Sequence, residues 1–111
     1  MRAENSALIV MKVHEYFVYI TANSTVSTIY TGITNSISRR ITEHYLNRGK
    51  AKSFAGKYHC YNLLYYEIFQ YVEDAIRREK QIKGYARLKK MNLIKIVNPK
   101  LKFINSELFD E

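Results

Sequence analysis

Tryptophan is absent from this sequence of 111 residues, and cysteine occurs once, at Cys60. A lone cysteine cannot close an internal disulfide and has no partner at metal-ligand spacing, so a disulfide scaffold and a structural zinc site are both excluded. Low cysteine usage therefore predicts a reducing, cytoplasmic setting.

Long apolar runs are also missing. The longest uninterrupted aliphatic run, from Ala7 to Met11, is only five residues long, whereas about 18 to 20 are needed to cross a bilayer. No small-residue cleavage site follows this run. We therefore expect neither a membrane-spanning nor a secreted protein.

Acidic residues are the third scarce class. Asp and Glu number 10 against 18 Lys and Arg, which gives a net charge of +8. At 47% hydrophobic and 25% charged residues, the composition is that of an ordinary folding chain. The length allows one small basic domain.

The positive charge is clustered in two segments. Residues 39–57 hold six basic residues and one acid, Glu43, and residues 77–90 hold seven and one acid, Glu79. Clustered charge of this kind is the electrostatic footprint of a protein that binds phosphates, whereas dispersed charge would indicate only a basic bias. The pattern favours nucleic acid as the partner, with no membrane and no obligate protein partner expected.

The first half of the chain predicts a hairpin and a helix. Residues 1–14 lack periodicity and are expected to form a flexible arm, in which Met11 offers an alternative start. Residues 15–22 and 26–33 are rich in aromatic and β-branched side chains with turn formers between them, which predicts a β-hairpin. Asn35 is the expected N-cap of a helix over about 36–47.

The second half predicts a mobile basic loop over 49–61 and a third strand over 62–70, apolar on both faces and therefore expected at the centre of the sheet. Apolar stripes predict helices over 72–85 and 88–97, the second ended by Asn98-Pro99. The expected fold is α+β, with the order β-β-α-β-α-α, a small three-stranded, largely antiparallel sheet flanked by helices, a single domain over 15–99, and a tail over 100–111.

Several polar residues interrupt apolar patterns. Arg40 and His44 are four residues apart and share one face of the first helix. Glu79 lies within the apolar stripe of the second helix, where a carboxylate is costly unless it has a partner or a metal. The alternative interpretations are a surface arginine beside an uninvolved histidine, and a glutamate paired with Arg78 or Lys83.

Tyrosine is abundant, with ten residues. Most of them are expected to pack in the core or at its rim. If the hairpin brings Tyr19 opposite Tyr30, however, two phenols converge beside Gly32, a residue that permits close approach of a ligand.

These residues together resemble a known family. Val18-Tyr19-Ile20, Tyr30-Thr31-Gly32, Arg40-xxx-His44 and the segment Arg78-Glu79-Lys80-Gln81-Ile82-Lys83 are similar, in this order, to the GIY-YIG nuclease domain, in particular to its small stand-alone endonuclease type. The resemblance covers about Tyr16 to Pro99. Val18 departs from the first motif glycine and Thr31 from the second motif isoleucine.

The resemblance implies an active site. Its catalytic residues would be Tyr19, Tyr30, Arg40, His44 and Glu79, with Glu79 holding one Mg²⁺ or Mn²⁺ ion. A late asparagine, Asn92 or Asn98, would join the site. The residues expected to contact nucleic acid are Gly32, Arg39, Arg48, Lys50, Lys52, Lys57, Lys83, Arg87, Lys89 and Lys90.

Phosphodiester hydrolysis gives these groups distinct tasks. Arg40 would clamp a phosphate oxygen and the cation would stabilise the leaving group. Tyr19, its phenol acidified by nearby positive charge, is the candidate base, while Tyr30 or His44 orients the water or relays the proton. The sequence does not decide between the two tyrosines.

The expected function is a divalent-metal-dependent endonuclease of GIY-YIG type, acting on DNA in preference to RNA with little sequence specificity and guided by substrate structure, as in repair or recombination. Two alternatives stay open. One is a catalytically weak or inactive nucleic-acid-binding module of the same fold. The other is a structural RNA-binding protein, in which Glu79 would serve only helix pairing.

Overall fold

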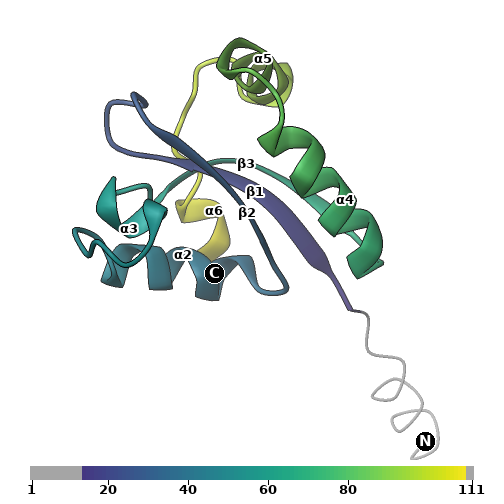
Figure 1. Ribbon diagram of the computed structural model, residues 1–111, viewed down its shortest axis with the longest axis horizontal. Helices are drawn as coiled ribbons and strands as arrows, with labels where there is room; N and C mark the ends of the chain where they lie inside the picture. The colour runs from purple at the N-terminus through teal and green to yellow at the C-terminus, as the bar shows by residue number, and fades with distance from the viewer. Residues whose placement is uncertain (1–13, 110–111) are drawn as a thin grey trace, which may run out of the picture.

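A three-stranded antiparallel sheet forms the centre of the protein, whose computed structural model describes residues 14–109 (Figure 1). The strands are β1 (Tyr16–Ala22), β2 (Ile29–Thr34) and β3 (Asn62–Phe69), in the order β2-β1-β3. Helices cover both faces of the sheet. The structure therefore has the α+β class and the three-stranded antiparallel sheet that the sequence predicts.

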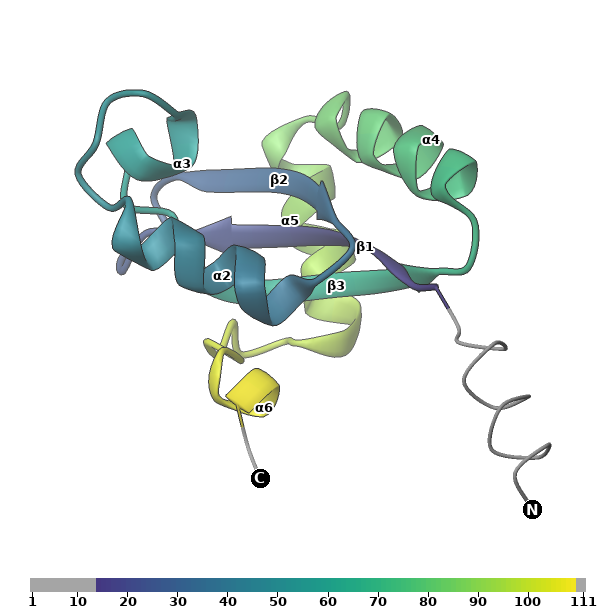
Figure 2. The ribbon, with the colours of Figure 1, turned by 90° about the horizontal axis from the view of Figure 1, so that it is seen from below.

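Alternation along β1 divides the core into two layers. Val18 and Ile20 point to one face, where α4 (Val72–Lys83) and α5 (Arg87–Val97) pack against them. Tyr19 points to the other face, which is covered by α2 (Ile37–Leu46) and α6 (Ser106–Phe109) (Figure 2). Because successive side chains of a strand point to opposite faces, the central strand contributes to both layers.

An ion pair ties α4 to β3. Arg78 Nε and Nη2 donate to the two carboxylate oxygens of Glu67, each at 2.9 Å, and Tyr65 Oη also donates to this carboxylate. Although partial burial opposes it, these hydrogen bonds hold the pKa of Glu67 below its ordinary value. A two-point guanidinium contact is directional, so it fixes the rotation of α4 about its own axis.

The hairpin and the first helix begin later than predicted. Val26 has a φ of 56° and lies in a turn whose backbone Asn23 N–H donates to Thr28 O at 3.2 Å. The turn therefore continues to Thr28, and β2 begins at Ile29 instead of residue 26. The predicted N-cap was also wrong: Ser36 caps α2, while the Asn35 side chain accepts from Arg39.

The third strand is an edge strand, so its predicted central position was wrong. Its outer side is covered by the segment that follows α5. Ile104 N donates to Leu63 O at 2.8 Å, and Leu63 N donates to the Asn105 side chain at 2.6 Å. The strand is apolar on both faces because both faces of the sheet are covered: Leu64 packs in the layer of α4 and α5, and Leu63 packs in the layer around Tyr19.

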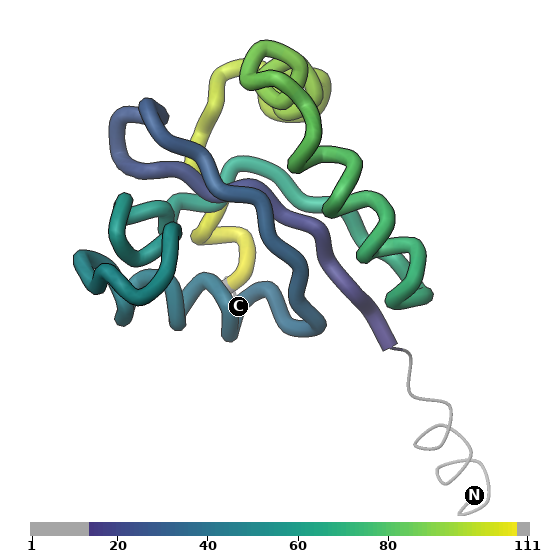
Figure 3. Tube along the Cα trace, in the orientation of Figure 1, coloured from purple at the N-terminus to yellow at the C-terminus, as the bar shows by residue number. Residues whose placement is uncertain are grey.

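The predicted C-terminal tail also needs correction over residues 100–108. The chain crosses from α5 back to the α2 side of the sheet (Figure 3), where Ile104 and Leu108 pack against the cluster around Tyr19. Hydrogen bonding to a strand edge is a long-range interaction, and no periodicity in a short segment reveals it. The predicted arm, apart from its last residue, lies outside the described residues.

The basic segment after α2 is more structured than predicted. It contains a short helix, α3 (Phe54–Lys57), whose first turn is capped by the Ser53 hydroxyl. A Cβ on Gly56 would lie 2.7 Å from the carbonyl oxygens of Asn47 and Lys50, so the segment packs tightly around this glycine. No helix within residues 14–109 combines the length and apolar character needed to cross a membrane.

Gly32 is required for packing against Tyr19. A Cβ at Gly32 would lie 2.5 Å from Tyr19 Cζ, so we expect Gly32→Ala to lower the free energy of unfolding by about 1 to 3 kcal/mol. Urea unfolding measures this change. Gly84→Ala is the matched control, because Gly84 has helical dihedrals and its Cβ would meet nothing closer than 3.5 Å. A gain of about 0.4 to 1 kcal/mol is expected there, and equal effects of the two changes would contradict the packing role.

Candidate active site

A hydrogen-bonded row of three side chains lies between the sheet and α2. Tyr19 Oη lies 2.8 Å from His44 Nε2, and Arg40 Nε donates to Tyr19 Oη at 3.4 Å. Arg40 and His44 are one turn apart on α2, as their spacing predicts. Tyr19 is completely buried and His44 is 4% exposed, so the row is shielded from water at its inner end.

The charge states of this row follow from burial. Burial and, next, the charge of Arg40 lower the pKa of His44 to about 4, so its imidazole is neutral at pH 7. A neutral Nε2 that accepts is consistent with a Tyr19 hydroxyl that donates to it while accepting from Arg40. The tautomer is assigned from this hydrogen-bond pattern.

The pKa of Tyr19 is shifted opposite to the predicted direction. Burial raises the pKa of the phenol and outweighs the lowering effect of the Arg40 hydrogen bond. The prediction of an acidified Tyr19 was therefore wrong, because the sequence shows the nearby arginine but not the burial. At neutral pH the Tyr19 phenol keeps its proton and acts as a hydrogen-bond donor.

Tyr30 lies at the more open end of the row. Its ring centroid is 6.2 Å from that of Tyr19 and 5.4 Å from that of His44. On its other side Phe54 is stacked at 6.2 Å with an interplanar angle of 24°, and Phe54 contacts Tyr58 at 4.7 Å. Sequence analysis missed this aromatic row, although two aromatic residues in a basic loop were a visible signal.

Glu43 is a second missed residue. Its carboxylate pairs with Arg40 Nη1 at 2.9 Å, and both side chains are more than a third exposed. With Nε directed at Tyr19, two of the three guanidinium nitrogens are oriented by the protein. The sequence did contain a signal, since Glu43 is the only acid in the first basic cluster.

Glu79 comes from the opposite side of the sheet. Its side chain is 14% exposed and pairs with Lys83 Nζ at 2.8 Å, which is the pairing that sequence analysis offered as the alternative. Among residues 14–109, no hydrogen bond or ion pair joins Glu79 to Tyr19, Tyr30, Arg40 or His44. The shielded carboxylate nevertheless does not point into bulk solvent.

The donors near Glu79 suit a hydrated cation. In the described part of the chain no three His, Cys, Asp or Glu side chains gather into a metal cluster. Mg²⁺ does not require one, because it commonly binds through one or two carboxylates and keeps several waters. Thr31 adds a buried hydroxyl without a hydrogen-bond partner on the face that α4 covers. The single carboxylate of Glu79 fits a mostly hydrated ion.

The residues predicted to bind nucleic acid fall into two groups. Arg39, Arg48, Lys50, Lys52 and Lys57 lie on α2 and the connection through α3 to β3, whereas Lys83, Arg87, Lys89 and Lys90 lie at the α4–α5 end (Figure 1). These two ends flank opposite faces of the sheet (Figure 1).

Two of the predicted contacts also have structural tasks. Arg87 donates to the backbone carbonyl oxygens of Val26 and Ser27 and so holds the hairpin turn. Gly32 is buried, and the close approach that it permits is that of the Tyr19 ring, not of a ligand.

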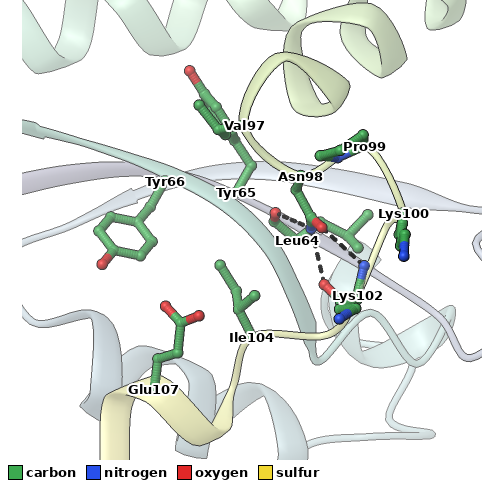
Figure 4. A pocket seen from close by; sticks show the side chains of 10 residues that line it. All are labelled: Leu64, Tyr65, Tyr66, Val97, Asn98, Pro99, Lys100, Lys102, Ile104 and Glu107. Atoms are coloured by element: carbon green, nitrogen blue, oxygen red, sulfur yellow. Dashed lines mark hydrogen bonds between the residues drawn. The ribbon is translucent and has the colours of Figure 1, made fainter.

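Neither candidate asparagine joins the row. Asn98 donates to Leu64 O and Lys102 O, each at 2.9 Å, and so anchors the C-terminal segment to β3. It lines a cavity of about 650 Å³ at the outer edge of β3, together with Tyr66 and Glu107 (Figure 4). Asn92 is exposed on α5. None of Tyr19, Arg40, His44 and Glu79 lines this cavity.

The buried imidazole predicts a pH dependence of stability. The pKa of His44 is lowered from 6.5 to about 4 in the folded state, so folding favours the neutral form. This stabilisation of the folded state is complete above pH 6.5 and is lost as the pH falls toward 4. The loss in the free energy of unfolding is about 3 kcal/mol at most. Urea unfolding at pH 7 and 4.5 measures it. His44→Gln has no ionisable group here and should show a smaller difference between the two pH values; an unchanged difference would contradict burial of neutral His44.

Comparison with known proteins identifies the family of this chain. The model of the "GIY-YIG catalytic domain" matches residues 15–92. A UPF0213 protein of Staphylococcus aureus is 36% identical over 80 residues, which are 72% of this chain and 94% of that protein. The solution NMR structure of a UPF0213 protein from Bacillus halodurans is 26% identical with a TM-score of 0.52, over 83% of this chain and 95% of that one. Because the family model matches more than half of the residues, this chain belongs to the GIY-YIG family of nuclease domains.

Proposed function

We propose that this protein is a Mg²⁺-dependent endonuclease that hydrolyses phosphodiester bonds of DNA with little sequence specificity, in repair or recombination. The observation that carries the proposal is the buried row in which Arg40 donates to Tyr19 and Tyr19 donates to neutral His44. Tyr19 and His44 are buried beside the partly exposed Arg40, and burying polar side chains is costly unless their arrangement is used.

Arg40 serves the phosphate. Its Nε donates to Tyr19 and its Nη1 donates to Glu43. These two contacts orient the guanidinium, and Nη2 is the nitrogen left to contact the phosphate. A fixed guanidinium stabilises the charge that develops on a non-bridging phosphoryl oxygen, at no cost of reorganisation during the reaction.

The two tyrosines have different tasks. Tyr19 is fully buried and its raised pKa keeps it protonated, so it holds Arg40 and His44 in place. Tyr30 is only partly buried and stands between this row and the Phe54 ring. We therefore assign Tyr30, rather than Tyr19, as the phenol that contacts the attacking water.

Glu79 would hold the divalent cation. Such an ion supplies a positive charge that stabilises the departing 3′ oxygen and the phosphoryl charge. The partial shielding of Glu79 favours this task, because water competes less with the bound oxygen of a shielded carboxylate.

The connection after α2 supports nucleic-acid binding beside the catalytic row. Lys57 Nζ lies 5.3 Å from the centroid of Tyr58, and Tyr58 continues the aromatic row from Tyr30 and Phe54. Lysines contact phosphates and exposed aromatic rings stack on bases without reading a sequence. This combination suits binding with little sequence specificity.

A binding module without appreciable turnover is the second candidate. The ion pairs Arg40–Glu43 and Lys83–Glu79 favour it, because each engages a proposed catalytic group with another protein side chain. Both pairs are partly exposed, however, and such pairs contribute only about 0 to 1 kcal/mol. A phosphate or a divalent cation can displace them.

The deciding experiment uses a panel of labelled duplex, flap, branched and single-stranded DNA and RNA substrates. Each substrate is incubated with the purified protein in Mg²⁺, in Mn²⁺, and in EDTA. We expect cleavage of DNA in Mg²⁺ or Mn²⁺ and none in EDTA. Binding to the panel, with affinity falling steeply as salt rises but without cleavage in either metal, would reject the nuclease and support the binding module.

A further inference from the structure

Two buried threonine hydroxyls have no hydrogen-bond partner within the described residues. They are the Oγ1 atoms of Thr21 and Thr31, whose residues are 0% and 4% exposed. Leaving a buried hydroxyl unpaired costs about 1 to 3 kcal/mol, and folded proteins rarely tolerate it without a reason. Each hydroxyl therefore needs an explanation from its surroundings.

The two hydroxyls lie on opposite faces of the sheet. Thr31 pairs in register with Ile20, so it shares the face on which Ile20 packs against α4. Thr21 pairs in register with Tyr30 and so lies on the α2 face. Along β2 the row directed at α4 is therefore Ile29, Thr31 and Ile33, with a single polar group in its middle.

Helix α4 presents a matching row. Ala75, Glu79 and Ile82 recur at helical spacing, and Ala75 and Ile82 are fully buried against the sheet. Glu79, between them and only 14% exposed, therefore lies on the sheet-facing side of α4. The contact of Arg78 with Glu67 fixes this side toward the sheet.

The facing rows place both polar groups on the interface between β2 and α4. Views from two sides place α4 beside β2 (Figures 1 and 2), and α4 packs against β2. Lys83 occupies Oε2 of Glu79, so Oε1 is the oxygen available for another partner. A neutral hydroxyl that can both donate and accept is suited to a carboxylate and to the waters of a hydrated cation.

We infer that Thr31 is a positioning residue of the cation site at Glu79, whose hydroxyl orients the carboxylate or a water bound to the ion. The inference rests on the proposed function, because it assumes that Glu79 holds the cation. Groups that orient metal ligands in this way commonly change metal affinity by about 10- to 100-fold when they are removed. The alternative is that the unpaired hydroxyl is only a packing defect.

The test measures Mn²⁺ binding directly, by the loss of the free-ion EPR signal during titration of the full chain without nucleic acid. Four variants are compared with the unmodified protein. Thr31→Val removes the hydroxyl at nearly constant volume, Thr31→Ser keeps it, and Glu79→Gln removes the carboxylate charge. Thr21→Val is the matched control, since it removes the other unpaired hydroxyl on the opposite face.

We expect Thr31→Val to weaken Mn²⁺ binding about 10-fold, while Thr31→Ser and Thr21→Val bind as the unmodified protein does. Both valine variants should keep or raise the melting temperature, because each removes an unpaired buried hydroxyl. A merely structural threonine would change the melting temperature without changing Mn²⁺ binding.

Two other results would overturn the inference and can be told apart. If Glu79→Gln weakens Mn²⁺ binding but Thr31→Val does not, Thr31 has no positioning role and the proposed cation site stands. If Glu79→Gln binds Mn²⁺ as the unmodified protein does, the cation is not at Glu79, and this part of the proposed function fails together with the inference.

Discussion

Glu79→Gln is expected to reduce DNA cleavage by at least about 1000-fold in Mg²⁺ while the protein stays folded. The substitution keeps the size of the side chain and removes the charge that we propose binds the cation. Metal-based charge stabilisation contributes several kcal/mol to such reactions, and 1.36 kcal/mol corresponds to a tenfold change in rate. Single-turnover cleavage of the best substrate from the panel, at saturating protein, measures the effect.

Stability should change little, because the ion pair with Lys83, whose side chain is 51% exposed, contributes about 0 to 1 kcal/mol. Glu73→Gln is the matched control, since Glu73 is an exposed acid in the first turn of the same helix. Its cleavage rate should stay within about twofold of the unmodified protein. Robust cleavage by highly purified Glu79→Gln protein would reject a metal at this carboxylate.

Local patterns predicted most of the fold. Aromatic and β-branched content over 15–22 and helical spacing around Ile37 and Ile41 are local properties, and the structure forms β1 and α2 there. The predicted boundaries of strands and helices were wrong where a single side chain or backbone dihedral angle determines the boundary. Val26 in a left-handed conformation shifts the start of β2 to Ile29, and nothing in the sequence around Val26 indicates that conformation.

Long-range pairing was not predictable in the same way. The apolar character of β3 predicted a central strand, yet β3 lies at the edge of the sheet, where Ile104 and Asn105 form hydrogen bonds with it. These residues are about 40 positions away in the chain. Hydrogen bonds of this kind depend on where the chain returns, which residue periodicity does not encode.

The candidate site was predictable as a set of residues but not as an electrostatic environment. Tyr19, Arg40 and His44 do meet, as their placement on a hairpin and one helix face requires. The sign of the Tyr19 pKa shift was wrong, because full burial outweighs one arginine. Burial is a property of the assembled core, and it changes Tyr19 from the expected base into a protonated hydrogen-bond donor.

Arg40→Ala is expected to slow single-turnover cleavage by about 100- to 1000-fold, the range found when one pre-oriented donor to a developing charge is removed. Arg40→Lys should still lose at least about tenfold. An ammonium is a single point charge and cannot contact Tyr19, Glu43 and a phosphate with the fixed geometry of a guanidinium. Arg77→Ala is the control, because Arg77 pairs with Asp74 on the exposed side of α4; its rate should stay within about twofold.

A second measurement separates this catalytic effect from loss of the site. Burial and, next, the charge of Arg40 lower the pKa of His44 to about 4, so removing that charge should raise the pKa while burial keeps it below 6.5. NMR titration of His44 in Arg40→Ala measures this pKa, and so reports both the loss of the Arg40 charge and the persistence of burial. Slow cleavage together with a His44 pKa between about 4 and 6.5 means that the buried site persists. The lost rate is then due to the guanidinium itself, which stabilises the transition state. A His44 pKa at its ordinary value would attribute the lost activity to an opened site, and cleavage within tenfold of the unmodified rate would exclude Arg40 from the chemistry.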